Sequence, residues 1–277
     1  MAIDKKQTAA QNRETRKDIR EKIRLEDTYK REVTTLLLAM VKDFRQRYAN
    51  TGLPTPEDEF IESWQESLTK HFKRVRRKFR NSVINNIDLD EDIITRDELE
   101  EIADTAFDNW TATITAEHAK IINDTTIRQM DDSVQEAIKI SREEDTPTDN
   151  VSIALLAGVL LKRKVKGRIP SITMYETQLP AEKSKDIEAT ESGSAIRAAR
   201  PTVIVPLDTK TWLTRNDSKV RPTHMALEGT TIDINQNFIV GGSSVRFPGD
   251  GSLGAALKEI INCRCRLQYN INGRLVQ

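Results

Sequence analysis

Apolar residues recur every three or four positions through the first half of the chain, a spacing typical of amphipathic helices. The first predicted helix covers residues 10–49, with a nearly all-charged beginning and an apolar stripe along the rest. A second helix is predicted to begin after Thr55 as N-cap, with Pro56 at the first helical position. Its apolar positions recur as far as Val83.

A third helical region opens with a capping box, in which Thr95 and Glu98 satisfy each other's backbone N–H groups. A break in this helix is expected near residues 123–124, and residues 146–150 end the helical half. The apolar run at residues 153–161 predicts a short buried helix.

The pattern changes after Gly167, where prolines and glycines become frequent. Short β-branched or alternating runs predict strands at 202–205, 231–234, 237–240 and 264–271, and helices are expected at 182–199 and 252–261. The predicted fold class is therefore α+β, with a long, mainly helical N-terminal arm followed by a small mixed α/β C-terminal module. The expected division is a helical region at 1–150, a connecting helix and linker at 151–180, and the module at 181–277.

Composition removes several classes of protein. Among 277 residues, 43 Lys and Arg balance 43 Asp and Glu, and the 31% of charged residues favours long solvated helices. The N-terminus lacks the apolar region of a secretory signal, and the longest apolar run, residues 151–161, is too short to span a bilayer. The two cysteines stand one residue apart, which suits a reducing compartment. We expect a soluble protein without a membrane partner.

Charge is strongly segregated along the chain: residues 5–80 are mainly basic, residues 88–149 mainly acidic, and the remainder basic again. Such asymmetry indicates surfaces for different partners. The densest cluster has seven basic residues in eleven positions, without alternating acids: Lys70, Lys73, Arg74, Arg76, Arg77, Lys78 and Arg80. These seven are the candidate nucleic-acid-binding residues, through sequence-independent phosphate contacts. The alternative is the solvated outer face of an amphipathic helix.

Two segments match part of the sequence pattern of a ligand-binding motif but lack other features that the motif needs. The acidic run at residues 88–92 has the opening spacing of an EF-hand, but Ile93 stands where Gly is needed and Leu99 where a bidentate Glu is needed. The G-x-G-x-x-G run at residues 249–254 lacks a preceding strand and a surrounding βαβ unit. Neither calcium nor a dinucleotide is therefore expected.

Chemistry in the C-terminal module depends on four residues. His224 with Asp217 would serve a hydrolytic site, but no G-x-S-x-G elbow accompanies them. Cys263, Cys265 and His224 are soft metal ligands, and Asp217 would complete a set of four, although paired zinc-binding cysteines usually stand two to four residues apart. The alternative is two small hydrophobic cysteines at the start of a strand. We expect no catalytic residue, no bound metal and no other cofactor.

Three segments of this module occur in a characteristic order. The first is Thr190-Glu191 at the head of a helix; the second runs from Trp212 to Gly229; the third joins Pro248-Gly-Asp250 to an Asn-Cys-Arg-Cys sequence. The residues of the pattern are Thr190, Glu191, Trp212, Asp217, Arg221, His224, Gly229, Pro248, Asp250, Asn262, Cys263 and Cys265. Residues 185–270 thereby resemble the Mu F-like minor head proteins of tailed bacteriophages, also called head morphogenesis proteins. Unlike many members of that family, this chain has no C-x-x-C at residues 220–224.

The resemblance implies a non-enzymatic minor capsid protein, present in few copies inside the procapsid at or near the portal. Its expected roles are head assembly, DNA packaging, and stabilisation or ejection of the genome end. The expected partners are the portal protein and the major capsid or scaffolding protein, with double-stranded DNA as a further candidate. The expected location is the head interior of the virion, reached from the host cytoplasm during assembly. The alternative is a DNA-binding protein or a nuclease that acts through the module, with His224 beside Asp217 or Glu191.

The same pattern leads to a structural hypothesis. A module of this size has a small apolar core, so polar side chains are needed to hold its loops. We expect Trp212, His224, Asn262 and the two cysteines to form one buried polar network. An ion pair between Arg221 and Asp217 is expected at its centre.

Overall fold

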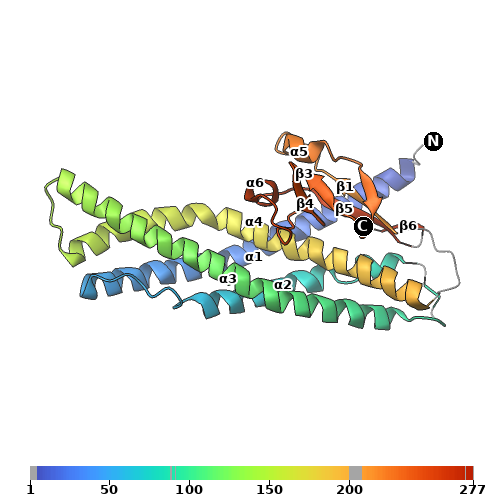
Figure 1. The fold of residues 1–277 in the computed structure, drawn as a ribbon, viewed down its shortest axis with the longest axis horizontal. Coiled ribbons are helices and arrows are strands. Elements are labelled where there is room, and N and C mark those ends of the chain that lie inside the picture. The colour runs from blue at the N-terminus through green and yellow to red at the C-terminus, as the bar shows by residue number, and fades with distance from the viewer. Residues whose placement is uncertain (1–4, 88, 91, 200–207, 272, 277) are drawn as a thin grey trace. The chain divides into compact units, whose positions relative to one another are not determined.

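The computed structural model describes residues 5–87, 89–90, 92–199, 208–271 and 273–276 (Figure 1). Its helices are α1 (Lys5–Thr51), α2 (Ile61–Phe79), the 3₁₀ turn η1 (Ile84–Asn86), α3 (Arg96–Glu143), α4 (Asn150–Ala199), α5 (Pro222–Met225) and α6 (Leu257–Ile260). Its strands are β1 (Thr209–Leu213), β2 (Thr231–Asp233), β3 (Phe238–Val240), β4 (Ser243–Val245), β5 (Arg266–Ile271) and β6 (Arg274–Val276). Long helices come first and a few short antiparallel strands follow, so the predicted α+β class is confirmed.

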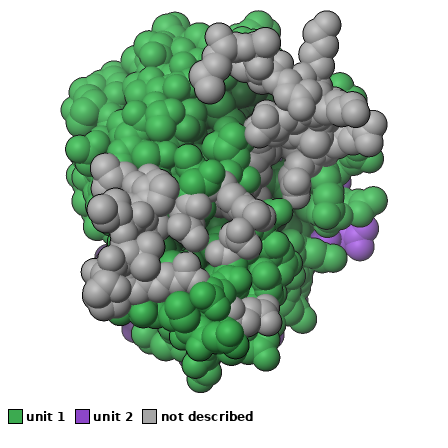
Figure 2. Space-filling model, turned by 90° about the vertical axis from the view of Figure 1, so that its right-hand side faces the viewer, with its two compact units in different colours: residues 1–25, 72–110, 174–277 green, residues 26–71, 111–173 purple. Residues whose placement is uncertain are grey.

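The chain forms two compact units whose segments interleave along the sequence. Unit 1 takes residues 1–25, 72–110 and 174–277, and unit 2 takes residues 26–71 and 111–173 (Figure 2). Each of the four long helices contributes residues to both units. This division differs from the consecutive one expected from the sequence, because helices of 47 to 50 residues carry the chain from one unit into the other.

Unit 2 is built on the predicted apolar stripe of α1. Val33, Leu37, Met40 and Phe44 follow one another at spacings of four and three, and all are fully buried. Trp64 of α2 packs into the same unit, with its indole Nε1 3.4 Å from the Met40 sulfur. Burying one face of a helix in this way stabilises it more than intrinsic propensity does.

Two helix starts were predicted from N-cap residues, and one is confirmed. Thr190 and Glu191, expected at the head of a helix, lie inside α4 instead. At the start of α3, the Thr95 N–H donates to Glu98 Oε2 over 2.8 Å and the Glu98 N–H donates to Thr95 Oγ1 over 3.3 Å, as a capping box requires. The predicted start of α2 after Thr55 is wrong, because that helix begins at Ile61. The Thr55 hydroxyl instead donates to Asp43 over 2.9 Å, so it is not available as a cap.

The expected break in α3 is also wrong, and α3 is continuous from Arg96 to Glu143. Asn123, at the expected break, is fully buried, and its side-chain amide donates to the Glu57 carbonyl. That bond gives the Asn side chain a partner outside its own helix, so it does not compete with the helical backbone. Within the acidic run considered as an EF-hand, Asp88 and Glu91 lie outside the described residues.

Helix α4 replaces the short helix, linker and second helix expected between residues 153 and 199. Gly167, Pro170 and Pro180 are all accommodated inside it, although proline removes a backbone donor. Residues 172–189 of this helix are buried on nearly every side. Because nearly every position between residues 172 and 189 is covered, this part of α4 shows no apolar stripe from which the length of the helix could be predicted.

The strands of unit 1 form a four-stranded antiparallel sheet in the order β2-β1-β5-β6 and a separate β3-β4 hairpin. Trp212 of β1 lies opposite Leu267 of β5. Strands expected at 231–234, 237–240 and 264–271 correspond to β2, β3 and β5, and the one expected at 202–205 lies outside the described residues. The helix expected at 252–261 shortens to the four residues of α6, since residues 251–254 form a turn.

The sheet is joined to the helices of unit 1 through polar side chains of α4. Fully buried Glu182 accepts a hydrogen bond from Lys22 of α1 over 2.6 Å and one from the Leu267 N–H over 3.3 Å. Gln178, one helical turn earlier, donates to the Cys265 carbonyl over 3.0 Å. These bonds fix the beginning of β5 and the cysteines just before it against α4. Figure 1 shows where these two elements lie.

Candidate functional site

The most chemically distinctive site in the described chain is formed by His224, Cys263 and Cys265. His224 lies on α5, which starts with Pro222 at its N-terminus. The cysteines follow α6, and the left-handed conformation of Asn262 (φ 57°) turns the chain there, so that the Cys263 N–H bonds to the Ile260 carbonyl over 3.3 Å. From Cys263 onward buried and half-buried residues alternate as in a strand, so both thiols point to the same inner face.

The three side chains meet around one nitrogen atom. His224 Nδ1 lies 3.5 Å from Cys263 Sγ and 3.4 Å from Cys265 Sγ. All three residues are buried, with exposed fractions of 2–3%. On the opposite edge of the imidazole, His224 Nε2 lies 3.2 Å from Glu259 Oε2, which also accepts the Thr223 hydroxyl over 2.9 Å. The arrangement presents one nitrogen and two sulfur donors to a single point.

Trp212 closes one side of this cluster. Its ring meets the His224 ring edge-on, with centroids 5.7 Å apart, and meets Phe238 of β3 in a similar way at 5.2 Å. The indole is 1% exposed. Edge-to-face aromatic contacts of this kind fix ring orientation, so the imidazole is held by both the indole and Glu259.

The two thiols titrate as a pair. The hydrogen bond from Cys265 lowers the pKa of Cys263, against the effect of burial. The same hydrogen bond, together with burial, raises the pKa of Cys265 far above its ordinary value. The first proton of the pair therefore leaves more readily from Cys263 than from Cys265.

The expected buried network is confirmed in part: Trp212, His224 and the two cysteines are buried together, whereas Asn262 is exposed. The ion pair predicted at its centre is wrong. Arg221 donates to the Ile261 carbonyl, and Asp217 pairs with Arg264 at 2.9 Å. Arg264 separates the two cysteines along the strand, so its side chain points to the other face, where Asp217 is available. Arg221 thus supports the turn at Asn262, and the centre of the network is the imidazole.

The remaining residues of the ordered pattern have local roles. Asp250 is buried, and its carboxylate accepts the N–H groups of Arg246 over 2.9 Å and Ser252 over 3.0 Å, which holds the loop after β4. Gly229 has a positive φ of 74°, and its N–H donates to the Trp212 carbonyl over 2.9 Å. Thr190 donates to the Asp186 carbonyl within α4, Glu191 is half-buried there, and Pro248 is buried.

The basic cluster on α2 is largely paired with acids. Lys70 pairs with Glu66 at 2.7 Å, Lys73 with Asp108 at 3.7 Å, and Arg80 with Glu100 at 3.2 Å and Asp104 at 3.0 Å. Arg74 is half-buried, whereas Arg77 and Lys78 are exposed.

Arg76 departs furthest from the expected role in phosphate binding. It is 5% exposed and pairs with the fully buried Glu188 and with Asp104. The expectation that Arg76 contacts nucleic acid is therefore wrong, because its guanidinium is buried and already neutralised.

Sequence reasoning missed the acids that complete these sites. Glu259 lies four residues before Cys263 and directly before Ile260 and Ile261, and this closeness to the cysteines is the signal that sequence reasoning passed over. Glu182 and Glu188 gave no such signal, because α4 carries many charges that look like a solvated face. Burial of these two carboxylates depends on partners more than 100 residues away in sequence.

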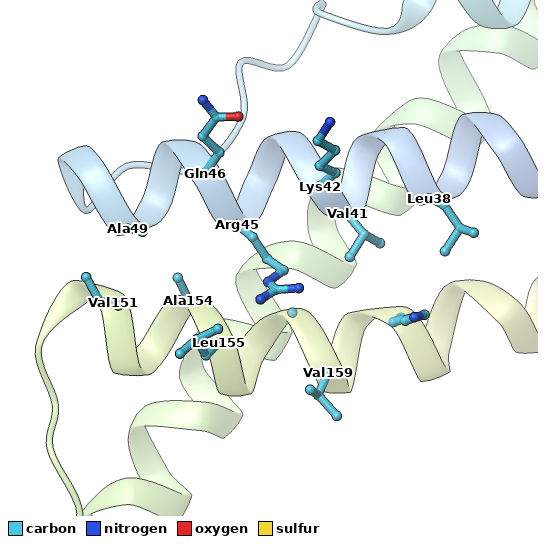
Figure 3. A pocket seen from close by; sticks show the side chains of 12 residues that line it. Leu38, Val41, Lys42, Arg45, Gln46, Ala49, Val151, Ala154, Leu155 and Val159 are labelled. Carbon is cyan, nitrogen blue, oxygen red and sulfur yellow. The ribbon is translucent and has the colours of Figure 1, made fainter.

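A groove is present in unit 2. It has a volume of about 570 Å³ and runs between α1 and α4, where Arg45 reaches across toward α4 (Figure 3). Its α4 side carries three exposed apolar side chains, Val151, Leu155 and Val159. The lining offers Lys42, Arg45, Gln46 and Lys162 as polar groups and no carboxylate, thiol or imidazole.

Comparisons of the chain with protein-family models, with curated proteins and with solved structures gave no match. In the part of the chain that the structure describes, no helix has a stretch both long and apolar enough to cross a bilayer. The function is therefore argued from the geometry of the C-terminal residues.

Proposed function

We propose that the chain is a structural protein of tailed-bacteriophage heads, a minor capsid protein that acts inside the procapsid at or near the portal. One observation carries the proposal. Trp212, His224, Cys263 and Cys265, which come from distant parts of the ordered Mu F-like pattern, form one buried cluster. A chance sequence match would give no reason for these residues to lie together in the folded chain.

The geometry favours an assembly role over catalysis. His224 is buried and held by Glu259 and the two thiols, whereas Asp217 is engaged with Arg264. A nuclease would need an accessible base near its substrate. The cluster instead ties α5, β1 and the start of β5 together, which is what a small rigid docking module requires.

Charge favours protein partners over DNA. Four of the seven basic residues in the α2 cluster form ion pairs with acids of the chain, and one of them, Arg76, is buried, so the cluster presents less positive charge than its sequence suggests. The proposed partners are the portal protein and the major capsid or scaffolding protein. Double-stranded DNA is a weaker candidate, and the proposed location is the head interior.

The test is co-purification of the tagged full-length chain with the portal protein encoded in the same genome, at low and high salt, with and without DNA. Binding that resists high salt and needs no DNA is expected. Trp212→Ala should weaken it, and Trp110→Ala, at an aromatic residue outside the cluster, is the matched control. Binding to DNA alone, lost at high salt, would replace the proposal with a nucleic-acid-binding function. Degradation of linear DNA that His224→Ala abolishes would replace it with a nuclease.

A further inference from the structure

The positions of His224, Cys263 and Cys265 fit the edges of a tetrahedron. Zinc binds thiolate sulfur at about 2.3 Å and imidazole nitrogen at about 2.0 Å, which places the two atoms about 3.5 Å apart at the tetrahedral angle. The two sulfur–nitrogen distances in the cluster are 3.5 and 3.4 Å, and all three donor atoms lie within 4.8 Å of one another. Both sulfur–nitrogen distances therefore match those around a single tetrahedral ion.

The imidazole has the tautomer and the support that a metal ligand needs. Glu259 Oε2 lies 3.2 Å from His224 Nε2, so the ring donates its proton there and leaves the Nδ1 lone pair facing the two sulfurs. A carboxylate that accepts the outer N–H of a histidine ligand is the usual second shell of a zinc site. Thr223 holds the same carboxylate oxygen over 2.9 Å.

A glycine leaves space for that carboxylate. A Cβ atom at Gly241 would lie 2.5 Å from Glu259 Oε1, and the backbone there has a φ of +55°. The adjacent Gly242 has a φ of +83°, but a Cβ there would meet no atom within 4 Å. The β3–β4 turn thus allows Glu259 to approach His224 closely.

We propose that His224 Nδ1, Cys263 Sγ and Cys265 Sγ bind one Zn²⁺ ion, with Glu259 orienting the imidazole and a water molecule in the fourth position. Two thiolates and one imidazole favour zinc over calcium or magnesium, which prefer oxygen ligands. The ion joins α5 to the start of β5 across 39 residues of sequence. That link closes the part of the module that contains β2, β3 and β4, where the apolar core is small. The proposal stands on this geometry and does not depend on the phage function.

The direct test is metal analysis of the full-length wild-type chain, purified with reduced thiols and without chelator. About one zinc per chain is expected. After removal of the metal, addition of Co²⁺ should give the visible and near-ultraviolet bands of a thiolate-bound tetrahedral ion. A wild-type chain that takes up neither Zn²⁺ nor Co²⁺ at a several-fold excess overturns the proposal, whatever the variants do.

Variants then identify the ligands. The Cys263→Ser/Cys265→Ser chain should lose the metal and the cobalt bands, whereas His118→Gln, in unit 2, should keep both. Asp217→Asn should also keep them, because Asp217 pairs with Arg264. Equal metal content in the double serine variant, or loss of metal in Asp217→Asn, overturns the proposed ligand set.

The role of Glu259 is measured by competition with a zinc chelator. Glu259→Gln should still bind one zinc at saturation, but about 10- to 100-fold more weakly. An unchanged affinity would remove Glu259 from the second shell, and loss of stoichiometric binding would make it a direct ligand.

Discussion

Replacing Arg76 by methionine tests whether buried ion pairs hold unit 1 together. The Arg76 side chain is 6% exposed and lies against the ring of Phe107, so methionine retains much of its packing. Its guanidinium donates to the Ser184 hydroxyl over 2.7 Å and to Asp104 over 2.9 Å, and it pairs with Glu188. Removing this cation leaves the fully buried Glu188 carboxylate without a counter-charge.

The magnitude follows from what remains around Glu188. Breaking a buried ion pair by removing one partner typically costs about 3–5 kcal/mol. The N–H groups of Asn81 and Val83 still donate to the carboxylate over 2.8 and 2.9 Å, so we expect the lower end, about 3 kcal/mol. Arg77→Met, at the exposed neighbouring position, should change the free energy of unfolding by less than about 0.5 kcal/mol.

The loss should depend on pH. Burial raises the pKa of Glu188 in the folded protein, and without Arg76 that pKa rises further. Around these pKa values the folded variant binds more protons than the unfolded chain, so its stability falls as pH rises. The difference between wild type and Arg76→Met should therefore be smaller at pH 5 than at pH 8.

The assay is urea unfolding followed by far-UV circular dichroism at both pH values. Adding Glu188→Gln to Arg76→Met should recover part of the loss, because no buried charge then remains unpaired. If Arg76→Met costs no more than Arg77→Met, or if its cost grows toward pH 5, the buried-pair argument is refuted.

Three further predictions concern local backbone and side-chain geometry. Asn262→Ala should lower the free energy of unfolding by about 1 kcal/mol, and Asn262→Gly by less, because the position has a positive φ of 57°; urea unfolding distinguishes them. Gly241→Ala should weaken zinc binding in the chelator competition, whereas Gly242→Ala should only reduce stability, since a Cβ at Gly241 alone would displace Glu259. Thr95→Ala should cost about 1 kcal/mol in the same unfolding assay by removing the capping box of α3, and a loss near zero would show that the cap is dispensable.

Sequence periodicity predicted the helices that have one buried face and failed for α4, in which residues 172–189 are covered on nearly every side. The α1 stripe of Val33, Leu37, Met40 and Phe44 is readable because solvent covers the other side of the helix. In α4 the buried positions include Glu182, and such polar residues look like surface until their partners are known. Those partners lie far away in sequence, so no local pattern contains them.

The sequence predicted which residues form most of the candidate site, but not which contacts they make. The order of the pattern placed Trp212, His224 and the cysteines in one module, and spacing suggested a shared network. Nothing in the spacing indicated that Arg221 would bond a carbonyl while Asp217 pairs with Arg264, because each choice depends on the turn at Asn262. That turn is set by one residue in the left-handed conformation.

The polar character of the module follows from its size. Strands of three to six residues bury few apolar side chains, and the sheet is joined to the helices by Lys22, Glu182 and Gln178. Each of these bonds has a defined direction, so together they specify a single arrangement more strictly than apolar packing alone. A polar group buried without its partner is costly. Removing one partner, either the proposed ion at His224 or the guanidinium of Arg76, should therefore lower the free energy of unfolding more than removing a single apolar contact at the surface.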